Sequence, residues 1–308
     1  MRFVPQTKFK NMRSLLIVPC LVAFCLAFSP VEAQHYKLFV YNELDGMQNT
    51  LVKAVEEDQF GLMWLATDGG LIRYDGNTFQ SYQDQIPTPY IKDLLQLEGR
   101  ILVSTDEGLY WLKPALQSAE IQPVAPESGL RLTKKLFQDQ AGQVWGSDNH
   151  RVFRLRGDDL TLYPFNEAYR SEDFTRSFSF FEDGWGQLYT VSKNGVLFAY
   201  REAEDGFSEP LYRFSTGVND VVRLRPGLVW VATYGGIYAL HLSREGKVEK
   251  VEQASALSPI ALHVTKRGEV IAAVRNQGLF QVEPDDGGHP LQPDDWPVTS
   301  FSSLFESH

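Results

Sequence analysis

After residue 33 the sequence contains no cysteine, because Cys20 and Cys25, its only two, lie near the amino terminus. The rest of the chain therefore cannot form disulfide bonds or thiolate metal sites, and its apolar core must hold it together. The six histidines are scattered, with no His-x-His or His-x-x-x-His pair. Because a metal site needs several converging ligands, the sequence predicts no metal and no cofactor.

The first 33 residues have the composition of a secretory signal peptide. Four basic residues precede an uncharged apolar run, residues 15–28, and Val31 and Ala33 offer small residues before a cleavage point. We expect cleavage after Ala33, which would place residues 34–308 in the periplasm; an uncleaved signal anchor is the alternative. No later apolar run has the length of a membrane span.

The chain is acidic, with a formal net charge of −10 and an isoelectric point near 5.1. The 33-residue leader carries four of the basic residues and one acidic residue, so the remainder is more acidic still. Such a surface repels phosphate backbones and anionic lipid headgroups, which argues against nucleic-acid binding and direct membrane-surface binding. A hydrophobic content of 43% suffices for a sizeable core.

A motif containing glycine recurs along the whole chain after the leader. Its anchor glycines are about 38 to 44 residues apart, and they are Gly61, Gly99, Gly142, Gly186, Gly227 and Gly268. A second glycine follows most of them nine or ten residues later, at Gly70, Gly108, Gly195, Gly236 and Gly278. The sequence therefore consists of six degenerate copies of one unit.

Each copy has the pattern of four short strands. A strand-length apolar run leads into a turn, which has the form Asp-x-x-Gly in three copies, and a strand with a central ring follows. This pattern predicts an all-β fold, a β-propeller of four-stranded blades, in which Trp64, Trp145 and Trp230 pack between blades. The copies span residues near 51–83, 91–122, 132–165, 175–213, 218–252 and 259–292.

The two ends resemble parts of one further blade. Residues 35–42 have the pattern of an outer fourth strand, and residues 298–308 have that of a first strand without successors. We therefore expect a seven-bladed propeller that is incomplete at its C-terminus, as a fragment of a longer protein. A six-bladed ring closed in another way is the alternative.

The first copy resembles the two-component regulator propeller repeat. The resemblance is carried by Val52, Val55, Glu57, Asp58, Gly61, Trp64, Thr67, Gly69, Gly70, Leu71, Arg73, Tyr74 and Gly76. It implies the periplasmic sensor region of a histidine kinase, which responds to an oligosaccharide or similar extracellular ligand. It also implies membrane attachment through a downstream helix, with a homodimer formed through the propeller or that downstream region. The chain has no kinase core, so we expect no enzyme activity from it.

A propeller of this topology predicts where a ligand would bind. Loops entering the first strands and turns between second and third strands emerge at one end, where unlike residues can converge. The candidates there are Asn49, Asp68, Tyr90, Asp106, Arg131, His150, Asn194, Asn219, Tyr234 and Arg275. Of these we select Tyr90, Arg131, His150, Asn219, Tyr234 and Arg275, because aromatic rings beside polar groups suit sugars.

Two other functions remain open from the sequence. A secreted propeller without a kinase partner would act as a protein-interaction scaffold. The Asp-x-x-Gly-x-x-Trp pattern also resembles the Asp-box turn of sialidase-like hydrolases, so a glycoside hydrolase or lyase is the third reading. That reading would require a pair of carboxylates or a tyrosine nucleophile beside a base, which the spacing does not single out.

Overall fold

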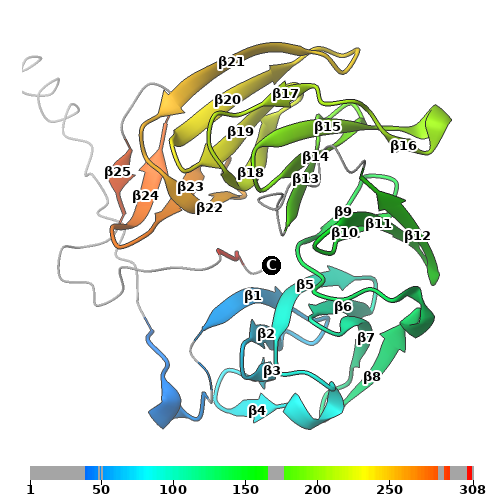
Figure 1. Ribbon diagram of the computed structural model, residues 1–308. Coiled ribbons are helices and arrows are strands. Elements are labelled where there is room, and N and C mark those ends of the chain that lie inside the picture. Colours follow the sequence, from blue (N-terminus) through cyan, green and yellow to red (C-terminus); the bar gives the residue numbers. More distant parts are fainter. Residues whose placement is uncertain are drawn as a thin grey trace, which may run out of the picture. The chain divides into compact units, whose positions relative to one another are not determined.

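A computed structural model shows a ring of β-sheets (Figure 1). It describes residues 39–47, 49, 51–165, 177–283, 288–291 and 304–306. The chain divides into two compact units, Met1–Val40 and Tyr41–His308, and the second contains all the sheets. The predicted leader lies outside the described residues, and none of the described helices is long and apolar enough to span a bilayer.

The sheets follow one another along the chain as six blades. Blades 1 to 3 are β1 (Val52–Glu57), β2 (Met63–Thr67), β3 (Gly70–Tyr74) and β4 (Phe79–Ser81); β5 (Ile91–Leu97), β6 (Arg100–Thr105), β7 (Gly108–Pro114) and β8 (Ala119–Val124); and β9 (Leu136–Gln138), β10 (Val144–Ser147), β11 (Arg151–Arg156) and β12 (Asp159–Pro164). Blades 4 to 6 are β13 (Phe178–Glu182), β14 (Leu188–Ser192), β15 (Val196–Arg201), β16 (Gly206–Phe207) and β17 (Tyr212–Arg213); β18 (Val218–Arg225), β19 (Leu228–Thr233), β20 (Gly236–Leu242) and β21 (Val248–Ser255); and β22 (Pro259–Val264), β23 (Val270–Val274), β24 (Gly278–Val282) and β25 (His289–Pro290). Short 3₁₀ turns, η1 (Glu43–Asp45), η2 (Gln83–Gln85), η3 (Pro126–Ser128) and η5 (Glu202–Glu204), are the helices of the described part.

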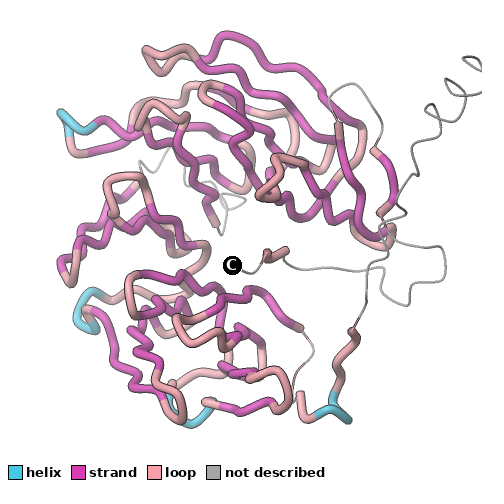
Figure 2. Tube along the Cα trace, turned by 180° about the vertical axis from the view of Figure 1, so that it is seen from behind, coloured by secondary structure: helices cyan, strands magenta, loops and turns pink. Residues whose placement is uncertain are grey.

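Every blade is antiparallel, with its first strand innermost and its last strand at the rim. Seen from behind, the same radial arrangement is clear (Figure 2). The prediction of an all-β propeller with four-stranded blades is therefore confirmed, although blade 4 divides its outer strand between β16 and β17. The described residues form six blades, and the expected seventh blade remains a prediction.

The turn between the first two strands explains the repeated Asp-x-x-Gly. In blade 1 the Asp58 carboxylate accepts the backbone N–H groups of Phe60 and Leu62, and its second oxygen accepts the indole N–H of Trp64 at 2.8 Å. Gly61 closes this turn with φ +77°, a conformation that side-chain-bearing residues rarely adopt. Asp139 binds Trp145 in the same way at 2.7 Å in blade 3.

The tryptophans pack where the sequence predicts. Trp64 lies in a cluster with Ile91 and Ile101 of the next blade, and Trp145 packs against Phe178 and Phe198 of its successor. Trp230 likewise contacts the apolar residues of blade 6. All three side chains are at most 1% exposed. Three of the contacts between successive blades are therefore built on large buried rings, whose burial stabilises the packing.

The two ends differ in part from expectation. Within residues 35–42, the described Phe39–Asn42 form no strand, so the expected outer strand is wrong there. Tyr41 instead packs its ring 5.2 Å from Tyr74 and accepts the Tyr74 hydroxyl at 2.7 Å. Leu304–Glu306, within the predicted strand 298–308, lie beside blade 6 without strand pairing (Figure 1).

Candidate functional site

The six selected residues all emerge at one end of the propeller. Tyr90 and Arg131 precede the first strands β5 and β9, and Asn219 is the second residue of β18. His150, Tyr234 and Arg275 lie in turns between second and third strands. Because these strands are antiparallel, both kinds of position lie at the same end, which we call the loop face. The opposite end, with the turns between first and second strands, is the turn face.

Asn219 and Tyr234 are brought together by a lysine that the sequence reasoning missed. Lys193, in the β14–β15 turn, donates to Asn219 Oδ1 at 2.6 Å, and its ammonium lies 5.0 Å from the centre of the Tyr234 ring. Asn219 Nδ2 in turn donates to the Pro259 carbonyl at 2.9 Å. Tyr234 is 59% exposed, so this cluster offers an open ring beside amide and ammonium groups.

Gly217 determines where the Tyr234 ring lies. A Cβ at Gly217 would come within 2.8 Å of the ring atom Cε2, closer than a carbon contact allows. The Tyr234 backbone N–H also donates to the Gly217 carbonyl at 3.0 Å. A side chain at position 217 would therefore displace the Tyr234 ring from its place on the loop face.

Tyr90, which lies three blades before Tyr234 in the ring, has similar surroundings. The Lys92 ammonium lies 5.2 Å from the Tyr90 ring centre and 3.1 Å from Asp106 Oδ1. Tyr90 is 48% exposed. Lys53 and Asp68 form the corresponding ion pair in blade 1. The signal was available in the sequence, because Lys53 and Lys92 are both the second residue of a first strand.

The other three selected residues do not join these clusters. Arg131 pairs at 2.5 Å with Glu107, which lies in the β6–β7 turn of the preceding blade, and both side chains are well exposed. His150 and Arg275 are exposed in their turns. Within the described part of the chain, no hydrogen bond or ion pair connects Tyr90, Arg131, His150 and Arg275 to one another. The loop face thus presents separate groups and no single assembled site.

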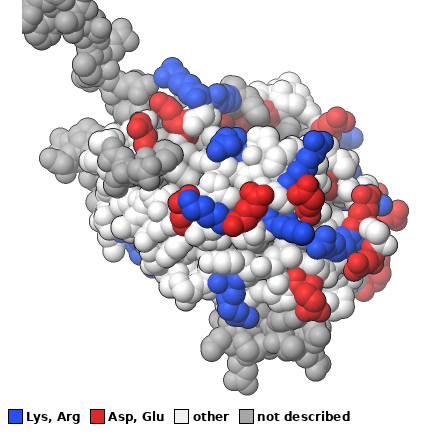
Figure 3. All heavy atoms as spheres, turned by 90° about the horizontal axis from the view of Figure 1, so that it is seen from above, with Lys and Arg blue, Asp and Glu red and all other residues white. Residues whose placement is uncertain are grey.

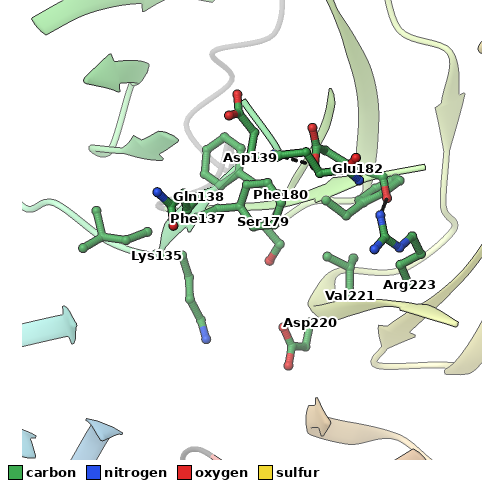
Figure 4. Close-up of a pocket in the computed structure, with 13 residues that line it drawn as sticks. Lys135, Phe137, Gln138, Asp139, Ser179, Phe180, Glu182, Asp220, Val221 and Arg223 are labelled. Carbon is green, nitrogen blue, oxygen red and sulfur yellow. Dashed lines mark hydrogen bonds between the residues drawn. The ribbon is translucent and has the colours of Figure 1, made fainter. Parts of the chain in front are cut away.

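A cavity of about 510 Å³ lies elsewhere, against the inner strands of blades 3, 4 and 5 (Figure 4). It runs from Lys135 and Asp220, near the starts of β9 and β18, to Gln140 and Glu182 at the turn face. Lys135 and Asp220 extend to the same side in Figure 4, away from Asp139 and Glu182. None of the six selected residues lines this cavity. Its volume is in the range of small-molecule sites.

The first strands of the blades surround a central channel. Several carboxylates on these strands accept hydrogen bonds from backbone N–H groups of a neighbouring blade. Asp93 accepts the N–H of Leu136 at 2.8 Å, and Asp220 accepts that of Leu262 at 2.9 Å. These bonds satisfy donors on inner strand edges that have no further strand to pair with. Burial, with the nearby charge of Asp93, raises the pKa of Glu56 to about 7. Acidic residues here mainly hold blades together.

A second polar cluster lies at the rim between blades 3 and 4. Asp205 accepts hydrogen bonds from the hydroxyls of Tyr200 and Tyr163 at 2.5 and 2.7 Å, and from Arg154 Nη1 at 2.8 Å. These bonds, that of Tyr200 first, lower the pKa of Asp205 to about 2. Arg154 also lies 5.6 Å from the centre of the Trp145 ring, so the cluster caps the blade core.

The surface has no extended field of one sign on the side drawn in Figure 3, where basic and acidic side chains alternate. On β21, for example, Lys250 pairs with Glu252 at 2.5 Å. Among the described residues, no group of three or more His, Cys, Asp or Glu could hold a metal ion. These features provide neither a nucleic-acid footprint on that side nor a metal centre in the described part.

No protein-family model matches the sequence, and no curated protein matches it either. Solved structures share its fold at low sequence identity. The extracellular domain of a hybrid two-component system from B. thetaiotaomicron has a TM-score of 0.68 and 16% identity, over 88% of this chain and 39% of that one. Another such domain from B. thetaiotaomicron has a TM-score of 0.64 and 20% identity, over 83% and 35%.

Propellers with other activities match as well. Virginiamycin B lyase from Staphylococcus aureus has a TM-score of 0.61 and 11% identity, over 84% of this chain and 89% of the lyase. At these identities the likeness shows the propeller fold and not an activity. The chain spans about two fifths or less of the two-component extracellular domains that it matches.

Proposed function

We propose that this chain is the ligand-sensing propeller of a two-component sensor, exported to the periplasm, with no catalytic activity of its own. The Tyr234, Lys193 and Asn219 cluster carries the ligand-binding part of the proposal. An exposed ring stacks on the apolar face of a sugar, while neighbouring amide and ammonium groups bind its hydroxyls. We therefore propose an oligosaccharide as the ligand class. The likeness to extracellular domains of two-component systems supports the sensor assignment.

The proposal includes a seventh blade. Glu182, the last residue of β13, accepts the N–H of Gln140 in the preceding blade at 2.9 Å. Glu306 accepts the N–H of Lys266 at the same distance, and Gln140 and Lys266 each lie two residues before an anchor glycine. Glu306 is thus positioned relative to blade 6 as Glu182, the last residue of a first strand, is positioned relative to blade 3. In this proposal the remaining strands, a membrane helix and a dimer contact belong to the downstream region that the family resemblance implies.

A measurement of amide exchange tests the seventh blade directly. Glu306→Ala should remove the exchange protection of the Lys266 amide, as Glu182→Ala should remove that of Gln140. The loss at Lys266 should be smaller, because Glu306 is more exposed than Glu182. If the Lys266 amide exchanges equally fast with and without Glu306, the segment does not occupy a first-strand position.

A thermal-shift titration of the purified chain with a panel of oligosaccharides tests the ligand. A saturable rise in the melting temperature is expected, since a ligand that binds only the folded state stabilises it. Tyr234→Ala should abolish the rise, whereas Phe60→Ala, an exposed ring at the turn face, should not. Absence of any shift from a cooperatively melting protein would favour the scaffold function. Turnover of a sugar would favour the hydrolase or lyase.

A further inference from the structure

Lys135 is unusual among the charged groups that face the channel. Its side chain is exposed to the cavity, yet it makes no hydrogen bond or direct ion pair with any described residue. The charges of Asp220 and Asp93 raise its pKa, so it is a cation at neutral pH. An ammonium group that faces a cavity without a direct protein partner is free to accept the carboxylate of a ligand as its partner.

Asp220 is the carboxylate whose charge acts most strongly on Lys135. One of its oxygens, Oδ2, is taken by the Leu262 N–H, which leaves Oδ1 available toward the cavity. The two charges influence each other, but no ion pair joins them. They extend to the same side of the cavity, Asp220 from β18 and Lys135 from the residue just before β9 (Figure 4). A ligand with both charges could therefore bind each group without separating an existing pair.

The rest of the cavity suits a small molecule with a polar backbone. Ser179 lies on the strand between those of Lys135 and Asp220, and Phe137 and Val221 supply apolar wall. At the turn-face end the cavity is lined by a second basic and acidic pair of residues, Arg223 and Glu182, whose charges influence each other. The volume of about 510 Å³ exceeds that of one amino acid, so there is room for a short peptide.

We propose that this cavity is a binding site for a zwitterion, a free amino acid or short peptide, whose carboxylate contacts Lys135 and whose ammonium contacts Asp220. The site is separate from the loop face and goes beyond the proposed sugar-sensing function. Either site can exist without the other, because they share no residue. The alternative hypothesis is that water alone solvates Lys135 and Asp220 and that no ligand binds between them.

Calorimetric titration of the full chain with the standard amino acids and diglycine, up to about 10 mM, tests the site. The wild type should bind at least one of these zwitterions. Lys135→Gln should weaken that binding about tenfold or more, as expected for loss of a charge-assisted contact. Asp220→Asn should do the same while its amide oxygen still accepts the Leu262 N–H. Lys113→Gln, an exposed change on β7, should leave the binding unchanged.

Charge-blocked probes make the assignment specific. The carboxamide of the zwitterion that binds should bind the wild type weakly and be insensitive to Lys135→Gln, and its N-acetyl form should be insensitive to Asp220→Asn. Melting curves of each variant show that it is folded. The proposal is overturned if no zwitterion binds to the folded wild type, or if blocked and free forms bind equally. A sugar response at the loop face would survive either outcome.

Discussion

The two ends of this propeller use acidic side chains in opposite ways. At the turn face, Asp58 and Asp139 are buried and accept backbone and indole N–H groups within their own blades. At the loop face, Glu107 meets Arg131 at a well-exposed surface, and Asp106 meets Lys92 beside an open ring. The first kind of bond replaces water in the core, whereas the second remains in contact with water.

This difference separates fold from function. A ligand that displaced Asp139 would break the blade, since a buried donor left without a partner costs a large part of the folding free energy. A ligand that displaces the Glu107–Arg131 pair at the loop face breaks only an exposed ion pair, and such pairs contribute little to stability. The exposed part of the loop face can therefore change its contacts while the turn face keeps the blades intact, as the proposed sensor function requires.

The largest expected effect on stability comes from removing a buried carboxylate at the turn face. Asp139→Ala leaves the Trp145 indole N–H and the Gln143 backbone N–H without their acceptor. Since both lie at a buried turn, we expect a loss of about 3 kcal/mol in the free energy of unfolding. Urea denaturation followed by tryptophan fluorescence measures it. A loss no larger than that of an exposed substitution would remove the structural role of the turn.

An intermediate effect is expected from Glu56, between blades 1 and 2, where the free energy of unfolding should depend on pH. The folded-state pKa of Glu56, about 7, lies above its ordinary value of 4.5, so the folded protein binds this proton more tightly than the unfolded one. This contribution to stability is complete below about pH 4.5 and is lost as pH rises to about 7. Above pH 7, Glu56→Gln should thus gain about 1 to 2 kcal/mol relative to wild type, after screening by solvent.

Urea denaturation at pH 5 and pH 8 checks this prediction. The wild type and Glu56→Gln should have similar stability at pH 5, where Glu56 is largely protonated when folded, and should differ at pH 8. Glu98→Gln is a matched control in the β5–β6 turn, where the side chain is exposed. A pH difference equal to that of the control would show that Glu56 is not desolvated by the neighbouring blade.

The sequence predicts the turn face better than the loop face, for a physical reason. The position of Asp58 relative to Gly61 and Trp64 is fixed by local geometry, and local geometry repeats along the chain. The contact between Lys193 and Asn219 joins different blades. Its partners are 26 residues apart, and no period of the sequence links them. The channel cavity depends on three blades at once, and neither Lys135 nor Asp220 belongs to a motif.

The smallest expected effect comes from the loop face. Glu107→Ala removes the ion pair with Arg131, whose side chain is 69% exposed, and should change the free energy of unfolding by less than about 0.5 kcal/mol. The same urea titration used for Asp139→Ala measures it, so the two carboxylates are compared in one assay. A loss approaching that of Asp139→Ala would mean that the loop face is also part of the structural core. A ligand could then not rearrange the loop face without a large loss of stability, and the proposed sensing site would have to lie elsewhere on the ring.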